Sequence, residues 1–197
     1  MKYCSFIFIL FVLAGCDSSE EIQTTPLLVP EDLTEHSKEF KKEIISVNDA
    51  IHVAIGYSLA NSIMVEADGG KIIIDTTGTI ETGREVRSIF DRLNPYPIKA
   101  VIYTHNHGDH VFGARAFVDN KQTEVIAHQT TEDYINRILG ILRPIISKRS
   151  SRMFGSVFPE ESIENNGIGP FLEIGREGRQ TSLIYPTKKF DEYLELS

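Results

Sequence analysis

Short runs of hydrophobic residues, alternating or continuous, occupy the middle of the chain and predict β-strands separated by turns. Ile51–Ile55, Asn61–Glu66 and Lys71–Asp75 have this strand pattern. Asp68-Gly69-Gly70 lies between the last two runs and is a hairpin signal. Ile98–Tyr103 is a further apolar run, typical of a buried strand. The pattern therefore predicts a strand-rich region between residues 51 and 103.

Helical spacing of apolar residues predicts the other elements. Such residues recur every three or four positions over Glu81–Leu93, and a proline-rich turn follows. Gly113–Asp119 predicts a shorter helix, Glu124–Ala127 a strand, and Thr130–Arg152 a long helical stretch. We expect this stretch to be interrupted near Pro144. Strands followed by strand–helix–strand units indicate an α/β sandwich in which helices cover sheets.

The N-terminus predicts a bacterial lipoprotein signal peptide over residues 1–16. Lys2 supplies a positive charge, and the apolar segment Phe6–Leu13 is shorter than the ~20 residues that a membrane span needs. Small residues then lead to Cys16, as in a lipobox. We expect a lipid on Cys16 to anchor the chain on the periplasmic side of the bacterial cell envelope. The alternative is an ordinary cleaved secretion signal with a chance cysteine.

Composition beyond the signal peptide limits what the chain does. Residues 17–43 predict a polar tether and a charged arm, and residues 44–197 predict one partial domain. The net charge of −8 argues against nucleic-acid binding, which needs a basic surface. Cys4 and Cys16 are the two cysteines, so the processed chain would offer no free thiolate. Any metal must therefore be held by histidine, aspartate and glutamate.

The strongest chemical signal is the sequence Thr-His-Asn-His-Gly-Asp-His, which directly follows the strand at Ile98–Tyr103. Its four candidate metal ligands are His105, His107, Asp109 and His110. Imidazole and carboxylate without thiolate suit zinc, with iron or manganese as substitutes. We expect His105 and His107 to face one ion, and the other two ligands to face a second. The alternative is a solvated histidine-rich loop that binds no metal.

This His-x-His-x-Asp-His motif resembles the signature of the metallo-β-lactamase fold, and the surrounding sequence resembles its alkyl sulfatase branch. The branch is indicated by Gly56–Glu66, by the residues that follow the motif, and by a later stretch, Lys148 to Pro170. The resemblance implies a metallo-β-lactamase-like αββα sandwich, of which this chain carries the N-terminal half. It also implies that Asp75, at the end of a strand, supports the metal loop.

The resemblance further implies a zinc-dependent hydrolase of sulfate esters, with two Zn²⁺ ions in a complete family member. Asp109 would then be both a ligand and the catalytic residue that orients the attacking water. Alkyl sulfates or similar anionic small molecules are the implied substrates, and homodimers are implied for full-length relatives. The last of the six histidines is His128, whereas the family takes further ligands from later in the chain. We therefore expect a truncated chain with weak metal binding and little activity.

Two other functions stay open from the residues alone. One is a lactamase- or thioesterase-like hydrolase with the same fold, and the other is a degenerate, non-catalytic lipoprotein. His128 is predicted as a capping or surface residue rather than a ligand, and His52 as a packing residue. A basic cluster near Pro144 would either bind the anionic sulfate or form a solvated helix face; its members are Arg143, Lys148, Arg149 and Arg152.

Overall fold

The computed structural model describes residues 29–159 and 162–196. The predicted signal peptide, the expected lipidation site Cys16 and most of the predicted tether lie outside these residues. No helix in the described ranges combines the length and the apolar character that crossing a bilayer requires. The first described helix, α1 (Glu31–Ser37), falls in the predicted charged arm.

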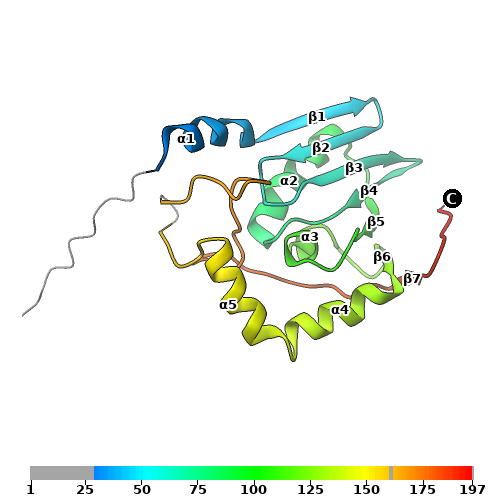
Figure 1. Cartoon of the computed structure of the whole chain (residues 1–197). Helices are drawn as coiled ribbons and strands as arrows, with labels where there is room; N and C mark the ends of the chain where they lie inside the picture. The colour runs from blue at the N-terminus through cyan, green and yellow to red at the C-terminus, as the bar shows by residue number, and fades with distance from the viewer. Residues whose placement is uncertain (1–28, 160–161, 197) are drawn as a thin grey trace, which may run out of the picture.

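Seven strands form one sheet whose spatial order follows the chain order (Figure 1). The first four strands are antiparallel neighbours, and the last four are parallel neighbours. The strands are β1 (Glu43–Asn48), β2 (Ile51–Ile55), β3 (Ser62–Ala67), β4 (Gly70–Ile74), β5 (Ile98–Ile102), β6 (Glu124–His128) and β7 (Lys188–Phe190). This mixed sheet with helices confirms the predicted fold class, an incomplete αββα sandwich.

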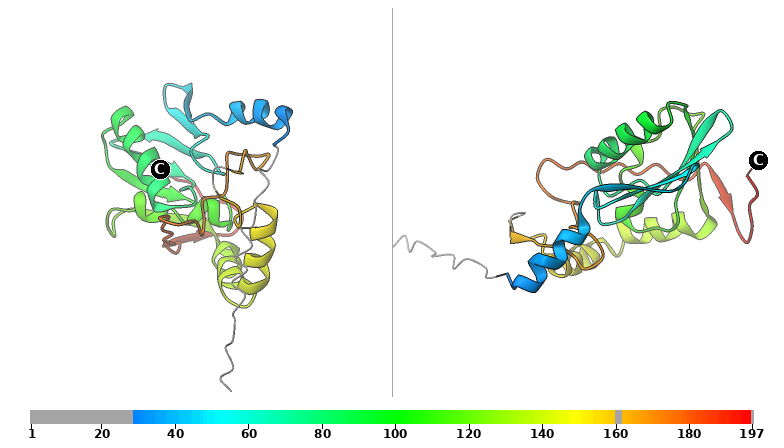
Figure 2. Two further views of the ribbon diagram at one scale, coloured as in Figure 1. Left: turned by 90° about the vertical axis from the view of Figure 1, so that its left-hand side faces the viewer. Right: turned by 90° about the horizontal axis from the view of Figure 1, so that it is seen from above.

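Helices connect the parallel strands, as crossover connections require. They are α2 (Ile80–Leu93), α3 (Gly108–Val111), α4 (Gln129–Leu139) and α5 (Arg143–Met153), with short 3₁₀ turns at Lys38–Phe40 and Ala114–Ala116. Seen from above, α2 lies on one side of the sheet and α4 on the other (Figure 2). An extended segment then runs from α5 back to β7 at the parallel edge of the sheet (Figure 1).

The apolar face of α2 fixes this helix on the sheet. Thr79 caps its first turn by accepting a hydrogen bond from the backbone N–H of Thr82. Val86 and Phe90 lie one turn apart and are fully buried in the main core. Burying side chains of this size contributes about 1.5–3 kcal/mol each. The helix predicted from the periodicity at Glu81–Leu93 is therefore confirmed.

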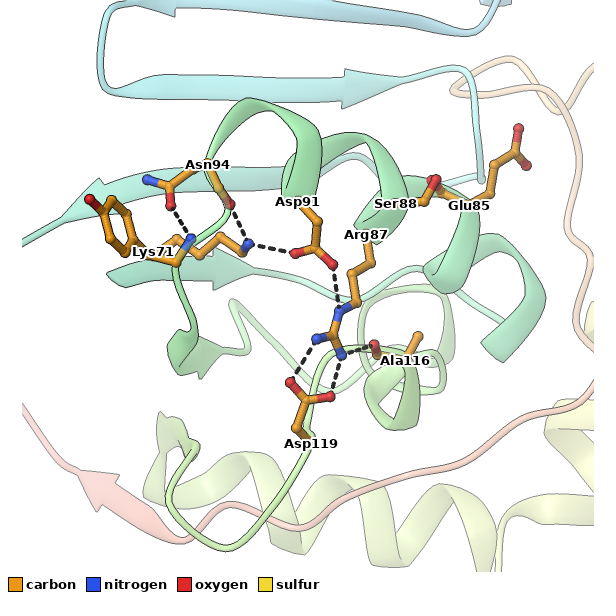
Figure 3. A network of polar contacts seen from close by, with 9 residues as sticks. Lys71, Glu85, Arg87, Ser88, Asp91, Asn94, Ala116 and Asp119 are labelled. Atoms are coloured by element: carbon orange, nitrogen blue, oxygen red, sulfur yellow. Dashed lines mark hydrogen bonds and ion pairs between the residues drawn. The ribbon is translucent and has the colours of Figure 1, made fainter. Parts of the chain in front are cut away.

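A polar network fastens α2 to the start of β4 and to the chain beyond α3 (Figure 3). The buried ammonium of Lys71 lies 2.5 Å from a carboxylate oxygen of Asp91 and 2.6 Å from the carbonyl of Asn94. Arg87 donates to Asp91 and forms a two-pronged pair with Asp119, at 2.5 and 2.6 Å. The network lies where β4 begins, at the opposite end of that strand from the histidine motif.

Three local features of the structure differ from the predictions. β1 and β7 were not expected from the pattern; β1 is largely exposed and β7 has three residues, so neither carries a clear apolar signal. Gly113–Asp119 does not form a helix, because only a 3₁₀ turn forms at Ala114–Ala116. The predicted interruption near Pro144 is confirmed, since α4 ends at Leu139 and α5 begins at Arg143. Pro144 lies in the first turn of α5, where proline needs no amide hydrogen.

Candidate metal centre

The histidine motif follows β5 and packs on the residues that follow β4, because the carboxyl ends of parallel strands meet at one edge of the sheet. Asp75 is the buried link between the two segments. Its carboxylate accepts hydrogen bonds from the backbone N–H of Thr104 at 2.9 Å and from the Thr104 hydroxyl at 2.7 Å. The same carboxylate lies 2.7 Å from Nδ1 of His110. Asp75 therefore orients the loop, as the resemblance implied.

The backbone around Asp75 is held in an uncommon conformation. Asp75 and Thr77 have φ values of 60° and 66°, in the left-handed region that non-glycine residues rarely adopt. Such conformations cost about 1–3 kcal/mol each and persist where surrounding contacts impose them. Here the imposed turn points the Asp75 carboxylate at the histidine motif. Strain of this kind concentrates at functional sites, which is consistent with a site at this edge.

A backbone clip joins the turn after β4 to α3. The backbone N–H and the hydroxyl of Thr76 both donate to the carbonyl of His110, at 2.8 and 2.9 Å. The N–H of Gly113 donates to the carbonyl of Thr77 at 3.0 Å. A side chain cannot fit at Gly113, because a Cβ there would lie 1.9 Å from the Thr76 carbonyl oxygen. The clip thus sets how closely the motif approaches β4.

The three imidazoles of the motif converge. The ring of His105 lies 4.0 Å from that of His110 and 4.6 Å from that of His107, measured between centroids. Asp109 approaches Nε2 of His110 at 3.4 Å. Within residues 29–159 and 162–196, no three His, Cys, Asp or Glu side chains are arranged to hold one ion. Among these rings, His105 lies nearest to His110, and the division of the four ligands between two ions stays a prediction.

Burial and charge shift the protonation of these groups. Burial lowers the pKa of His110, but its contacts with Asp109 and Asp75 outweigh burial and raise it to about 9. Burial and the neighbouring imidazoles lower the pKa of His105. Burial raises the pKa of Asp109, and the contact with His110 reverses this and lowers it. The motif without metal therefore contains an imidazolium between two carboxylates.

The donor set fits a zinc ion in chemical type. A metal-binding histidine usually donates its second ring N–H to a carboxylate, and Nδ1 of His110 already faces Asp75 in this way. Nε2 of His110 then lies 3.4 Å from a carboxylate oxygen of Asp109, so a cation bound there would contact both groups. His105, His107, Asp109 and His110 are the residues that would hold the metal. Asp75 would support them without binding it.

A cavity of roughly 890 Å³ opens beside the motif, and His107 and Asp109 form part of its wall. Apolar side chains come from α4, α5 and the loop after β2, among them Leu59, Ile138 and Ile146. Three arginines also line the cavity, namely Arg143, Arg149 and Arg179. An apolar cavity with a few charged groups near candidate catalytic residues is typical of a site for a small amphiphilic ligand.

The other residues singled out from the sequence are distributed as follows. Of the basic cluster, Arg143 and Arg149 line the cavity, whereas Lys148 and Arg152 do not. His128 caps α4, since its ring accepts a hydrogen bond from the backbone N–H of Thr130, as predicted. His52 is buried and lies 2.9 Å from the hydroxyl of Ser46, as expected for a packing residue.

Sequence reasoning did not find Glu173, a buried carboxyl next to a residue of the cavity wall, Ile174. One oxygen of Glu173 accepts a hydrogen bond from the Ser58 hydroxyl at 2.7 Å. Its second oxygen is buried without a hydrogen-bond partner among the described residues. Burial raises the pKa of this carboxyl, although the Ser58 bond opposes the shift. A glutamate in an irregular segment gives no sequence signal of burial, so only the fold reveals it.

Glu173→Gln should remove a pH dependence of stability. Because the folded-state pKa of Glu173 is raised, its contribution is fully present below the unfolded pKa and is lost as pH rises through the folded value. The amide keeps the shape without the charge, so the stability of the variant relative to the parent should be higher at pH 8 than at pH 5. Urea unfolding at both values measures this. The exposed Glu177→Gln is the matched control, and an equal gain there would contradict the argument.

Comparison with known proteins adds to this geometry. A family model described as the metallo-beta-lactamase superfamily matches residues 55–177. A linear primary-alkylsulfatase of a Pseudomonas species is 34% identical over 139 residues, which cover 67% of this chain and 26% of the relative. An alkyl/aryl-sulfatase of Saccharomyces cerevisiae is 28% identical over 166 residues, which cover 77% and 24% of the two chains.

Among solved structures, a stereoselective inverting sec-alkylsulfatase from a Pseudomonas species superposes with a TM-score of 0.69. The identity is 23%, and the match covers 77% of this chain and 25% of that one. At this identity the likeness concerns the fold. The chain spans about a quarter of the length of these relatives.

Proposed function

Because this chain belongs to the metallo-beta-lactamase superfamily, we propose that it is a zinc-dependent hydrolase of alkyl sulfate esters. One observation carries the proposal: three converging imidazoles and Asp109 lie beside a cavity that combines apolar walls with arginines. An alkyl sulfate has a hydrocarbon chain and a fixed negative charge, which this lining complements. The two relatives that are 34% and 28% identical to this chain are named as a linear primary-alkylsulfatase and an alkyl/aryl-sulfatase.

The proposed ligands are His105, His107, Asp109 and His110, and two zinc ions are expected when further ligands are present. When bound, zinc lowers the pKa of a coordinated water to about 7, which makes hydroxide available at neutral pH. Asp109 would also orient the attacking water. Asp75 holds Nδ1 of His110 at 2.7 Å and so fixes the direction of its other nitrogen. This carboxylate is a positioning residue, because it lies behind the ligands.

The residues that line the cavity would bind the two parts of the substrate, the sulfate group and the alkyl chain. Arg143, Arg149 and Arg179 would attract the sulfate group by charge-assisted hydrogen bonds. The aliphatic chain would lie along Leu59, Ile138 and Ile146, where leaving water stabilises binding by about 25 cal/mol per Å² of apolar surface. Acylation of Cys16 would place this activity at the bacterial cell envelope, on the periplasmic side. Dimerisation, as expected of longer relatives, is a further proposal.

The test is zinc content together with sulfate release from decyl sulfate by the purified full chain. Near-stoichiometric zinc with measurable turnover would support the proposal, and His107→Ala should then weaken zinc binding at least tenfold and abolish turnover. His128→Ala is the control, since this histidine caps α4. Retained zinc and turnover in the His107 variant would refute the assignment. Stoichiometric zinc without turnover would favour the non-catalytic alternative.

A further inference from the structure

One side of helix α5, here called its outer face, borders a groove separate from the cavity beside the metal motif. We define it by six residues at helical spacing that line a surface groove of roughly 710 Å³: Pro144, Ile145, Lys148, Arg149, Arg152 and Met153. The opposite face of the helix turns to the cavity beside the metal motif through Ile146, Ser147 and Ser150. No residue of α5 is buried. The helix therefore has a second side that the described protein leaves uncovered.

The charge of this region is opposite to that of the chain. Residues 134–159 contain five arginines and lysines and no aspartate or glutamate, whereas the whole sequence has a net charge of −8. Lys148 and Arg152 form no ion pair with any carboxylate in the described ranges. A local excess of unpaired cations attracts an anionic surface and repels a cationic one.

Exposed aliphatic side chains accompany these cations. Ile145 is 66% exposed and Met153 is 55% exposed. Ile141, in the turn between α4 and α5, is 82% exposed. Cations and exposed aliphatic side chains thus lie on one face, where electrostatic attraction to anionic lipids and burial of apolar area would act together. The aliphatic side chains enter the headgroup region while the cations meet the phosphates.

The position of α5 agrees with contact to a membrane. The start of α1 and the whole of α5 lie at the side of the molecule away from β7 (Figures 1 and 2). Ser37, the last residue of α1, accepts a hydrogen bond from Asn165 at 2.7 Å, which ties this helix to the segment after α5. Residues 17–30 can span at most about 50 Å when extended, so a lipid on Cys16 would keep this side near the bilayer.

We propose that the outer face of α5 binds the surface of an anionic phospholipid bilayer. Its cations pair with lipid phosphates, and Ile145 and Met153 insert among the acyl chains nearest the surface. Arg149 and Met153 line both this face and the cavity beside the metal motif. If the proposed function holds, an amphiphilic sulfate dissolved in the bilayer would therefore lie next to the cavity. The binding itself does not depend on hydrolysis.

The absence of tryptophan from the sequence allows a site-specific test. Ile145→Trp in the full chain places one fluorophore on the outer face of α5, and vesicles of phosphatidylcholine are compared with vesicles that contain phosphatidylglycerol. We expect a blue shift of the emission, and quenching by brominated lipid, with the anionic vesicles. Tyr96→Trp is the control probe, because Tyr96 is 59% exposed and follows α2 at the far end of the sheet.

Charge variants complete the test. Lys148→Gln with Arg152→Gln should weaken the probe-detected affinity for anionic vesicles roughly thirtyfold, since each cation near such a surface contributes about fivefold. Lys99→Gln with Lys121→Gln should change it less than twofold, and 0.5 M salt should weaken binding by the parent. Circular dichroism verifies folding. Equal shifts with neutral and anionic vesicles would overturn the proposal, as would a shift that depends on protein concentration without vesicles, which would indicate a second copy.

Discussion

Gly113→Ala should lower the free energy of unfolding by about 3 kcal/mol, which corresponds to a fall in Tm of about 6–12 °C. The cause is a steric clash between the added methyl group and neighbouring backbone atoms. The added Cβ would lie 1.9 Å from the carbonyl oxygen of Thr76 and 2.9 Å from that of Thr79. Both atoms belong to backbone, and the N–H of Gly113 is itself bonded to Thr77. The segment cannot move away without breaking the clip that holds the metal motif against β4.

The control for this prediction is Gly178→Ala. Gly178 has a φ of 73° but nothing within 4 Å of its added Cβ. This substitution therefore tests backbone conformation alone and should cost about 1–2 kcal/mol. Thermal unfolding followed by circular dichroism measures both variants. A Gly113 variant no less stable than the Gly178 variant would show that the clip yields easily. Zinc binding should weaken in the Gly113 variant and stay unchanged in the control.

Asp91→Ala should also destabilise the protein by about 3 kcal/mol, the lower end for breaking a buried ion pair. The side chain of Lys71 is 1% exposed, whereas that of Asp91 is 43% exposed. Removing the aspartate leaves the buried ammonium with the Asn94 carbonyl as its remaining hydrogen-bond partner among the described residues. Arg87 loses less, since it keeps its two-pronged pair with Asp119 and its bond to the Ala116 carbonyl (Figure 3).

The reverse substitution should have a small effect. Lys71→Met replaces the buried cation by an apolar chain of similar length, and the partly hydrated Asp91 keeps Arg87 as a partner. We expect a change within about 1 kcal/mol, because exchanging a buried charge for a hydrophobic group is often neutral. In the Lys71→Met background, Asp91→Ala should then cost less than about 1 kcal/mol. Urea unfolding of the four proteins gives the coupling energy. Equal costs of Asp91→Ala in both backgrounds would contradict the argument.

Strong local patterns made several elements predictable from the sequence. The spacing of Val86 and Phe90 predicts α2, and the apolar run before Thr104 predicts β5, because each pattern reports a face that the fold buries. β1 escaped prediction since its side chains are mostly exposed, so no alternation marks it. β7 is too short to carry a period. Both form because the sheet offers backbone partners, which is a long-range effect.

In the candidate site too, some features could be predicted from local sequence and others depend on long-range contacts. The four motif residues could be named from spacing, and the support by Asp75 followed from the resemblance. The distances among their side chains could not be predicted, because they depend on the turn at Asp75 and Thr77, where φ is positive. Glu173 lies at least 63 residues from the motif in sequence, and only the fold of the long segment after α5 makes it buried.

The polar network and the metal motif lie at opposite ends of β4. Lys71 and Asp75 are four residues apart, so about 13 Å of rigid strand separates the two. Free-energy changes at sites this far apart usually add. Stabilising substitutions near the polar network should therefore raise the free energy of unfolding without changing the metal motif. The added stability would allow destabilising substitutions at the motif in a chain that stays folded.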